Sequence, residues 1–184
     1  SDDIFILIPP QPPANFYDYR VQVGADHSRG MFWYHPHPHG LTEGQVLGGM
    51  SGAIIIEGLI ETNYPNLAGI TEQIMLLKDI ERPGDTTGTP KTKTINGLSS
   101  PTISIRPGEL QFWRIGNVGA DSYFNLSLDG HKFWVIAIDG NATKCPMPTS
   151  TLFIPPGARV EVLVLGGQEG TFSLRSLAVD TGPQ

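Results

Sequence analysis

This 184-residue chain has few of the sequence features that mark disulfide-bonded, membrane-spanning or nucleic-acid-binding proteins. One cysteine, Cys145, excludes an internal disulfide and says little about the redox compartment. No apolar run approaches the length that crosses a membrane, so we expect no membrane span. The 12 basic residues form no cluster and are outnumbered by 18 acidic ones, giving a net charge of −6. We therefore expect no nucleic-acid partner.

Long amphipathic helices are also missing, and the best helical segment is a short turn near residues 41–47. In their place, 22 glycines and 16 prolines punctuate the chain at short intervals. This spacing predicts an all-β sandwich or barrel, and a hydrophobic content of 39% is enough for a packed core.

The expected strands are runs of apolar, alternating or β-branched residues between turn signals. They cover residues 17–23, 52–57, 73–80, 102–105, 110–118, 123–128, 132–138, 151–154, 159–165 and 171–177. The run Ile54-Ile55-Ile56 predicts a strand that is buried on both faces.

Three dipeptides predict defined turns. Asp129-Gly130 predicts a two-residue hairpin between its flanking strands. Pro107-Gly108 and Pro156-Gly157 each predict a type II turn, since proline fixes the first central φ and glycine accepts the positive second one.

The chain divides where this alternation stops. Residues 58–66 read as a connection, so we expect one unit over residues 1–62 and a second over 68–184. Residues 81–93 read as a polar loop within the second unit. The first residues do not form a signal peptide, and we expect the chain to begin inside a structured region.

Three of the five histidines stand at alternate positions. His35, His37 and His39 are separated by Pro36 and Pro38. A residue before proline is held extended, so these side chains share one face, about 6 to 7 Å apart at neighbouring backbones. Proline cannot donate to a sheet ladder, which puts the row at a strand end or edge. Clustered imidazoles favour a metal site over a chance loop cluster.

The sequence around these histidines resembles a known family. Residues 30–40, Gln45 and residues 49–57 resemble the second copper-binding motif of multicopper oxidases, which include laccases and bacterial cuprous oxidases. Other segments are similar to the middle cupredoxin domain of that family: residues 94–97, 105–109, 113–117, 128–131, 135–140 and 156–159. The resemblance implies cupredoxin-like Greek-key β-sandwiches, one partial and one complete.

The resemblance also implies copper as the cofactor. His35 and His37 match the two histidines that bind the paired type 3 coppers, one on each metal. The motif gives His39 no copper, so we expect it to support the ligands or the local structure. The family's other histidine motifs are absent, so the type 1 and type 2 ligands are expected in a missing N-terminal segment and a third cupredoxin domain. Alone, this chain should be inactive, because a catalytic metal needs its full ligand set.

An intact parent would couple one-electron oxidation of a small reducing substrate to the reduction of dioxygen to water. The resemblance leaves that substrate open among phenols, aromatic amines and metal ions, and it implies a periplasmic or secreted location.

Two other functional classes remain open. His37-Pro38-His39 followed by Glu43 imitates the first metal motif of a cupin, but no histidine occurs after His131 to supply a fourth ligand. A cupredoxin that has lost copper and serves as a binding scaffold is the non-enzymatic alternative. Retention of the paired histidines favours a parent that uses metal.

Four other residues have side chains that can bind metal or take part in catalysis, but their sequence contexts favour structural roles. Cys145 precedes Met147 by two residues but lacks the histidines of a blue-copper site. His131 is expected to be a packed or hydrogen-bonded residue, and His27 a turn residue. Glu43 is expected to be a solvated carboxylate at a helix start.

Overall fold

The computed structural model describes residues 6–8, 16–86 and 89–182. Strands dominate it, with two short helices and one 3₁₀ turn. The helical elements are α1 (Thr42–Leu47), α2 (Leu59–Asn63) and η1 (Pro65–Leu67). The strands are β1 (Gly30–Tyr34), β2 (Gly52–Ile56), β3 (Thr71–Ile80), β4 (Thr92–Ile95), β5 (Leu110–Asn117), β6 (Phe124–Leu128), β7 (Phe133–Ile138), β8 (Asn141–Thr149), β9 (Leu152–Ile154), β10 (Arg159–Leu165) and β11 (Leu174–Ser176).

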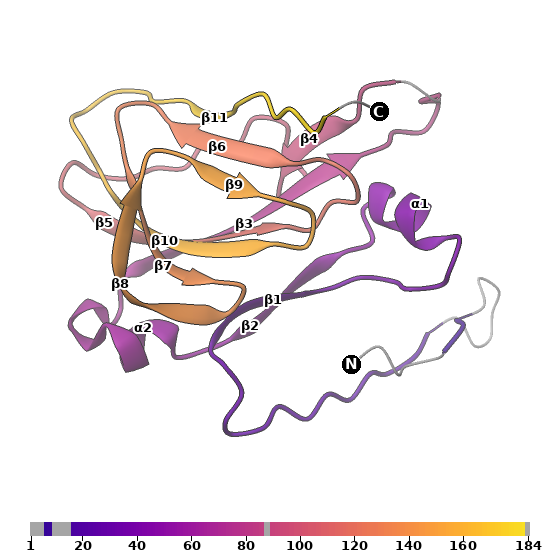
Figure 1. Cartoon of the computed structure of the whole chain (residues 1–184), viewed down its shortest axis with the longest axis horizontal. Coiled ribbons are helices and arrows are strands. Elements are labelled where there is room, and N and C mark those ends of the chain that lie inside the picture. Colours follow the sequence, from indigo (N-terminus) through magenta and orange to yellow (C-terminus); the bar gives the residue numbers. More distant parts are fainter. Residues whose placement is uncertain (1–5, 9–15, 87–88, 183–184) are drawn as a thin grey trace.

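These strands form three sheets (Figure 1). A six-stranded sheet has the order β4-β3-β5-β10-β7-β8, and a three-stranded sheet has the order β11-β6-β9. The pair β3 and β5 is parallel, and the remaining pairs are antiparallel. Strands β1 and β2 form a separate two-stranded sheet, and β1 contacts β5 and β10 of the large sheet. The all-β sandwich expected from the sequence is confirmed.

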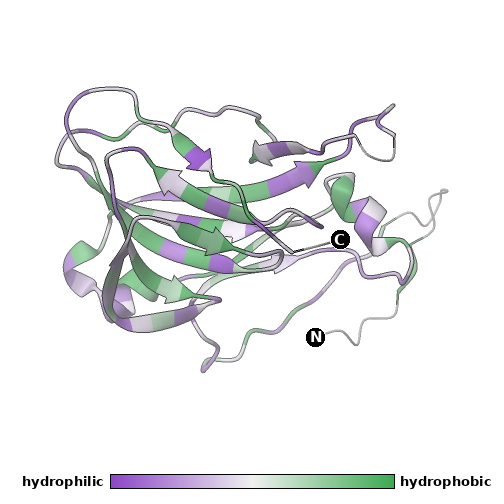
Figure 2. Ribbon diagram, turned by 45° about the horizontal axis from the view of Figure 1, so that its top comes forward, coloured by the Kyte–Doolittle hydropathy of each residue, from purple (hydrophilic) through white to green (hydrophobic). Residues whose placement is uncertain are grey.

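The large sheet buries apolar residues on both faces. Its inner face packs on the three-stranded sheet through alternate residues, such as Trp113 and Ile115 of β5 and Val162 of β10. Its outer face packs on α2 through a second cluster that includes Phe112 and Leu163. Figure 2 shows the hydrophobic residues concentrated on these central strands. Being covered on both sides, β5 does not alternate between buried and exposed residues.

A buried carboxylate near the end of β3 connects that strand to the loop between β5 and β6. Asp79 is fully buried and accepts hydrogen bonds from the backbone N–H groups of Ala120, Asp121 and Ser122 at 2.8 to 3.0 Å. These bonds fix the loop between β5 and β6, since a buried carboxylate is stable only with such donors.

Many of the predicted elements are confirmed. The helical turn is α1, and eight of the predicted strands correspond to β2, β3, β5, β6, β7, β9, β10 and β11, with small shifts at their ends. Both Pro-Gly turns close with the expected hydrogen bonds, from Glu109 N–H to the Arg106 carbonyl and from Ala158 N–H to the Pro155 carbonyl, each at 3.0 Å. Gly108 and Gly157 have the required positive φ, +75° and +79°.

Two predicted strands do not form. Residues 17–23 are exposed and pair with no described residue, although their sequence alternates. An alternating sequence can place its apolar side chains on one face, but a stable strand also needs a neighbouring strand to pair with. Residues 102–105 are extended without a ladder, and Ile103 and Ile105 pack against the core as loop residues.

Other predictions were wrong about partners and burial. Asp129-Gly130 is not a hairpin, because β6 and β7 belong to different sheets and the turn carries the chain from one to the other. Strand β2 is not buried on both faces, because Ile54 is 41% exposed. The connection at residues 58–66 contains α2, and the loop at 81–93 runs into β4.

Strand β8 was not predicted at all. It lies at the sheet edge, carries Pro146 and Pro148 and is largely exposed, so it has neither apolar alternation nor an interior position to reveal it. Among the described helices, none has the length and apolar character to cross a membrane.

Candidate metal centre

The three clustered histidines follow β1 directly. His35 stands one residue beyond Tyr34, the last residue of the strand, and the chain stays extended through Pro38 before it turns at His39. The His35 and His37 ring centroids are 5.4 Å apart, and those of His37 and His39 are 5.8 Å apart. The imidazoles therefore form a row at the end of the strand.

The hydrogen bonding of His35 leaves one ring nitrogen for a ligand. Its Nδ1 lies 2.9 Å from the Pro36 carbonyl oxygen, which can only accept, so Nδ1 carries the proton and donates. In a neutral imidazole the lone pair is then on Nε2, the arrangement that metal-binding histidines commonly use. His35 is half-buried, whereas His37 and His39 are exposed.

The row suits copper as a partial ligand set. Imidazole is a good copper ligand, and two rings 5.4 Å apart can each reach a separate metal of a close pair or share one metal. Within the described residues, no group of three or more histidine, cysteine, aspartate or glutamate side chains has the geometry of a complete site. His35 and His37 would thus hold copper together with ligands from elsewhere.

Glycines of the large sheet let β1 approach closely. A Cβ on Gly116 would lie 2.7 Å from Cε of Met31, and one on Gly157 would lie 3.4 Å from Cζ2 of Trp33. Arg159 completes the contact, because its Nε donates to the Met31 carbonyl at 3.1 Å. The strand that ends in the histidines is therefore seated on β5 and on the turn before β10.

We predict that Gly116→Val lowers the free energy of unfolding by about 1 to 3 kcal/mol, because the added branches enter the space of Met31. The measurement is urea denaturation. Gly44→Ala is the control: nothing lies within 4 Å of its Cβ position in α1, and alanine favours helix. Equal stabilities for the two variants would show that β1 does not seat on Gly116.

Under β1 lies a buried ion-pair network that the sequence did not reveal. Arg114 of β5 is 2% exposed and pairs with Glu161 of β10, which is 1% exposed. Its Nε also donates to Glu72 Oε1 at 2.9 Å, and its guanidinium lies 4.5 Å from the Phe112 ring centroid. Burial raises the pKa of Glu161, and the charge and hydrogen bond of Arg114 partly oppose that rise. Arg114 and Glu161 are 47 residues apart, so no local pattern joins them.

The other histidines considered in the sequence, His131 and His27, make hydrogen bonds that support the local structure. His131 Nδ1 lies 2.7 Å from the Asp129 carbonyl oxygen, while its Nε2 accepts from Gly167 N–H at 3.2 Å, so both nitrogens are engaged. His27 Nδ1 lies 2.8 Å from the carbonyl oxygen of Ser28, as expected of a turn residue.

The two other candidates also lack a metal environment. Glu43 lies in the first turn of α1, where its charge helps to raise the pKa of Asp121, behind the larger effect of burial. Cys145 is free and exposed on β8.

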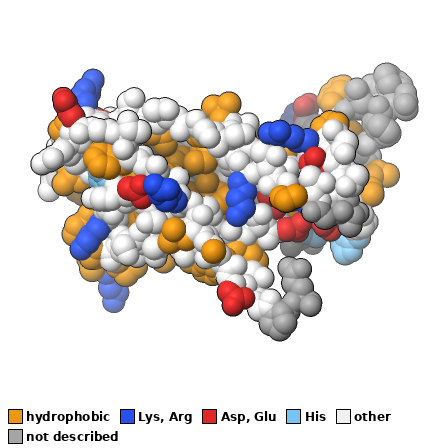
Figure 3. Space-filling model, turned by 90° about the horizontal axis from the view of Figure 1, so that it is seen from above, with side chains coloured by type: hydrophobic (Ala, Val, Ile, Leu, Met, Phe, Trp, Pro, Cys, Tyr) orange, Lys and Arg blue, Asp and Glu red, His pale blue; other side chains and the backbone are white. Residues whose placement is uncertain are grey.

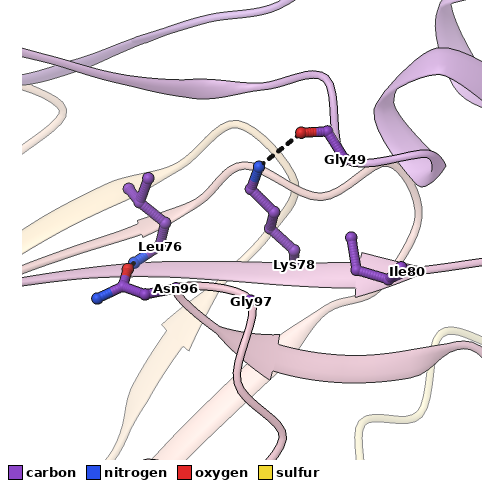
Figure 4. A pocket seen from close by; sticks show the side chains of 6 residues that line it. All are labelled: Gly49, Leu76, Lys78, Ile80, Asn96 and Gly97. Carbon is purple, nitrogen blue, oxygen red and sulfur yellow. Dashed lines mark hydrogen bonds between the residues drawn. The ribbon is translucent and has the colours of Figure 1, made fainter.

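A hollow of about 420 Å³ lies away from the histidine row. Gly49, Lys78, Ile80 and Asn96 are among its lining residues (Figure 4). Lys78 Nζ donates to the Gly49 and Ser51 carbonyls at 2.9 and 2.7 Å, and its burial lowers its pKa. Lys78 therefore holds the loop after α1, and the hollow contains no histidine or carboxylate that would make it a metal site.

Charged side chains on the face seen from above are scattered, with both signs interspersed (Figure 3).

Comparisons with known proteins identify the family of the chain. The sequence profile described as Multicopper oxidase matches residues 33–182, so the chain belongs to the multicopper oxidase family. A solved structure, the multicopper oxidase from Campylobacter jejuni described as a metallo-oxidase, superimposes with a TM-score of 0.71 and 29% identity, covering 83% of this chain and 34% of that one.

Two curated relatives have different names. Laccase-3 of Oryza sativa subsp. japonica is 26% identical over 96% of this chain and 34% of its own length. Cell division protein FtsP of Edwardsiella tarda (strain FL6-60) is 27% identical over 86% of this chain and 38% of its own length. The chain spans about a third of the length of the curated relatives it matches.

Proposed function

We propose that this chain is part of a multicopper oxidase and that His35 and His37 each bind one copper of its type 3 pair. The observation that carries the proposal is the pair of imidazoles, 5.4 Å apart at the end of β1, within a chain of this family. The free Nε2 of His35 supports it, as does the seat that the large sheet provides for β1.

The chemistry follows from that assignment. When bound, the copper cluster supplies the reduction of dioxygen to water with electrons from a small reducing substrate, such as a phenol, an aromatic amine or a metal ion. The protein's own contribution in this chain is to hold the two imidazoles on an ordered strand end, with the Nδ1 proton of His35 tied to the Pro36 carbonyl. His39, one step further along the row, would support His37 from behind.

The proposal includes the rest of the protein. We place the end of a first cupredoxin domain, with β1 and β2, in residues 1–62 and the middle domain in residues 68–184. An N-terminal segment and a third domain would supply the remaining ligands, so this chain alone should not turn over. A periplasmic or secreted location fits the family.

A scaffold without copper is the second candidate, favoured by the similarity to a relative named as a cell division protein. The two readings differ in the use of His35 and His37. A cupin is not supported, because the chain belongs to the multicopper oxidase family.

The test is copper binding by this chain, measured by competition with a chelator of known affinity. We expect His35→Ala/His37→Ala to weaken Cu(II) binding by about 100-fold, since both proposed ligands are lost, and His39→Ala to have a smaller effect. His27→Ala is the matched control, a histidine outside the row, and should bind as the wild type does. If the double variant binds copper as tightly as the wild type, the ligand assignment is wrong. That result would favour a copper-free scaffold.

A further inference from the structure

The indole of Trp33 lies between a proposed copper ligand and the large sheet. Its ring is stacked on the imidazole of His35, with centroids 4.3 Å apart and planes at 18°. It also lies close to Gly157, where a Cβ would stand only 3.4 Å from Trp33 Cζ2. A side chain at Gly157 would therefore contact the indole.

Arg159 holds the same turn and strand together. Its Nη1 donates to the Gly157 carbonyl at 2.9 Å, and its Nε donates to the Met31 carbonyl at 3.1 Å. Its guanidinium also lies 5.5 Å from the centroid of the Phe32 ring, within the range of a cation–π interaction. Arg159 therefore links the turn that contacts Trp33 to the residues that precede Trp33 in β1.

We propose that Trp33 is a positioning residue that sets the ring plane of His35 for copper. This inference rests on the proposed role of His35 as a ligand. An imidazole at a strand end can turn about its χ angles, and χ2 of histidine is broad. Stacking restricts the plane of the ring, while the hydrogen bond from Nδ1 to the Pro36 carbonyl sets which edge faces outward. Together they restrict the orientation of the ring and so the direction in which Nε2 points.

The arrangement also connects the two units of the chain. Strand β1 precedes the connection at residues 58–66, and Gly157 follows it, so a turn of the second unit supports the histidine of the first. A copper ligand would then be positioned by a part of the protein that supplies no copper ligand itself.

The test compares Trp33 variants by Cu(II) affinity and by the electron paramagnetic resonance spectrum of the copper-loaded chain. Trp33→Leu and Trp33→Met remove the flat ring and should weaken Cu(II) binding by about ten-fold, with altered copper hyperfine coupling. Trp33→Phe keeps a stacking ring and should stay within about two-fold of the wild type. Trp134→Leu, at a tryptophan on β7 that is 39% exposed, is the control for loss of an indole.

Thermal unfolding of each variant separates positioning from damage to the fold. The methionine variant keeps much of the volume, so it remains informative if the leucine variant is unstable. Wild-type affinity and an unchanged spectrum in folded Trp33→Met would overturn the inference, while a loss of affinity in His35→Ala would still stand for the proposed function. If His35→Ala binds copper as the wild type does, the proposed function fails first and the inference falls with it.

Discussion

In the full-length protein, replacing His35 by alanine should lower the rate of oxygen consumption by more than about 100-fold. Residues that merely orient a metal ligand already cost 10- to 100-fold in metal affinity or activity, and His35 is proposed as a ligand itself. The half-buried imidazole has its Nδ1 engaged by Pro36, which leaves Nε2 as the nitrogen that would bind copper. The measurement is oxygen uptake with a phenolic substrate, together with the copper content of the purified variant.

His27→Ala controls this experiment, because His27 is an exposed histidine outside the row. It should keep both its copper and its rate within about two-fold of the wild type. Full activity in the His35 variant would mean that the copper pair is held elsewhere, whatever the family of the chain.

Replacing Arg114 by methionine should lower the free energy of unfolding by about 3 to 5 kcal/mol, the range for breaking a buried ion pair from one side. The substitution leaves Glu161 at 1% exposure without its cation, and that cost exceeds the lost attraction. Denaturation by urea measures it. Arg175→Met is the control, because the pair of Arg175 with Asp129 is exposed, and the urea midpoint should hardly move.

The pH dependence checks the same explanation. Burial raises the pKa of Glu161, so the folded state binds a proton at a pH where the unfolded chain does not. The stability linked to this group is fully present below the unfolded pKa, near 4.5, and is lost as pH rises through the raised value. The loss of unfolding free energy in Arg114→Met, relative to the wild type, should therefore be smaller at acidic pH. In Arg114→Met/Glu161→Leu much of the stability should return at neutral pH, and a double variant as unstable as the single one would contradict this origin.

Sequence reasoning worked where the signal is local. The alternation of His35, His37 and His39 with prolines is enough to predict neighbouring imidazoles, because the geometry of an extended chain is fixed within a few residues. The Pro-Gly turns succeeded for the same reason. The helical turn at α1 and the well-bounded strands of the sandwich were likewise predicted from short patterns.

Features that depend on distant partners were missed. The alternating residues 17–23 form no strand, since no described neighbour pairs with them. Asp129-Gly130 can form the turn of a hairpin or a turn between two sheets. The pairing of β6 with β9 and β11 shows that here it joins two sheets. The strand β8 escaped because an exposed edge does not require an apolar pattern.

The supporting residues of the site were missed for a similar reason. No local sequence pattern assigns a role to Trp33 or Arg159. Their roles depend on a contact across 128 residues, between Arg159 and Met31. Mid-strand Gly116 was the available clue, because glycine inside a strand often marks a close approach of another segment.

The most direct test of the copper assignment is anomalous diffraction at the copper edge from crystals of the copper-loaded full-length protein. Among the copper peaks, the account predicts a pair about 3.5 to 4 Å apart, one member about 2.0 to 2.1 Å from a ring nitrogen of His35 and the other at that distance from a ring nitrogen of His37. Copper bound elsewhere with neither ring coordinated, or an iron or manganese ion at the row, would contradict it.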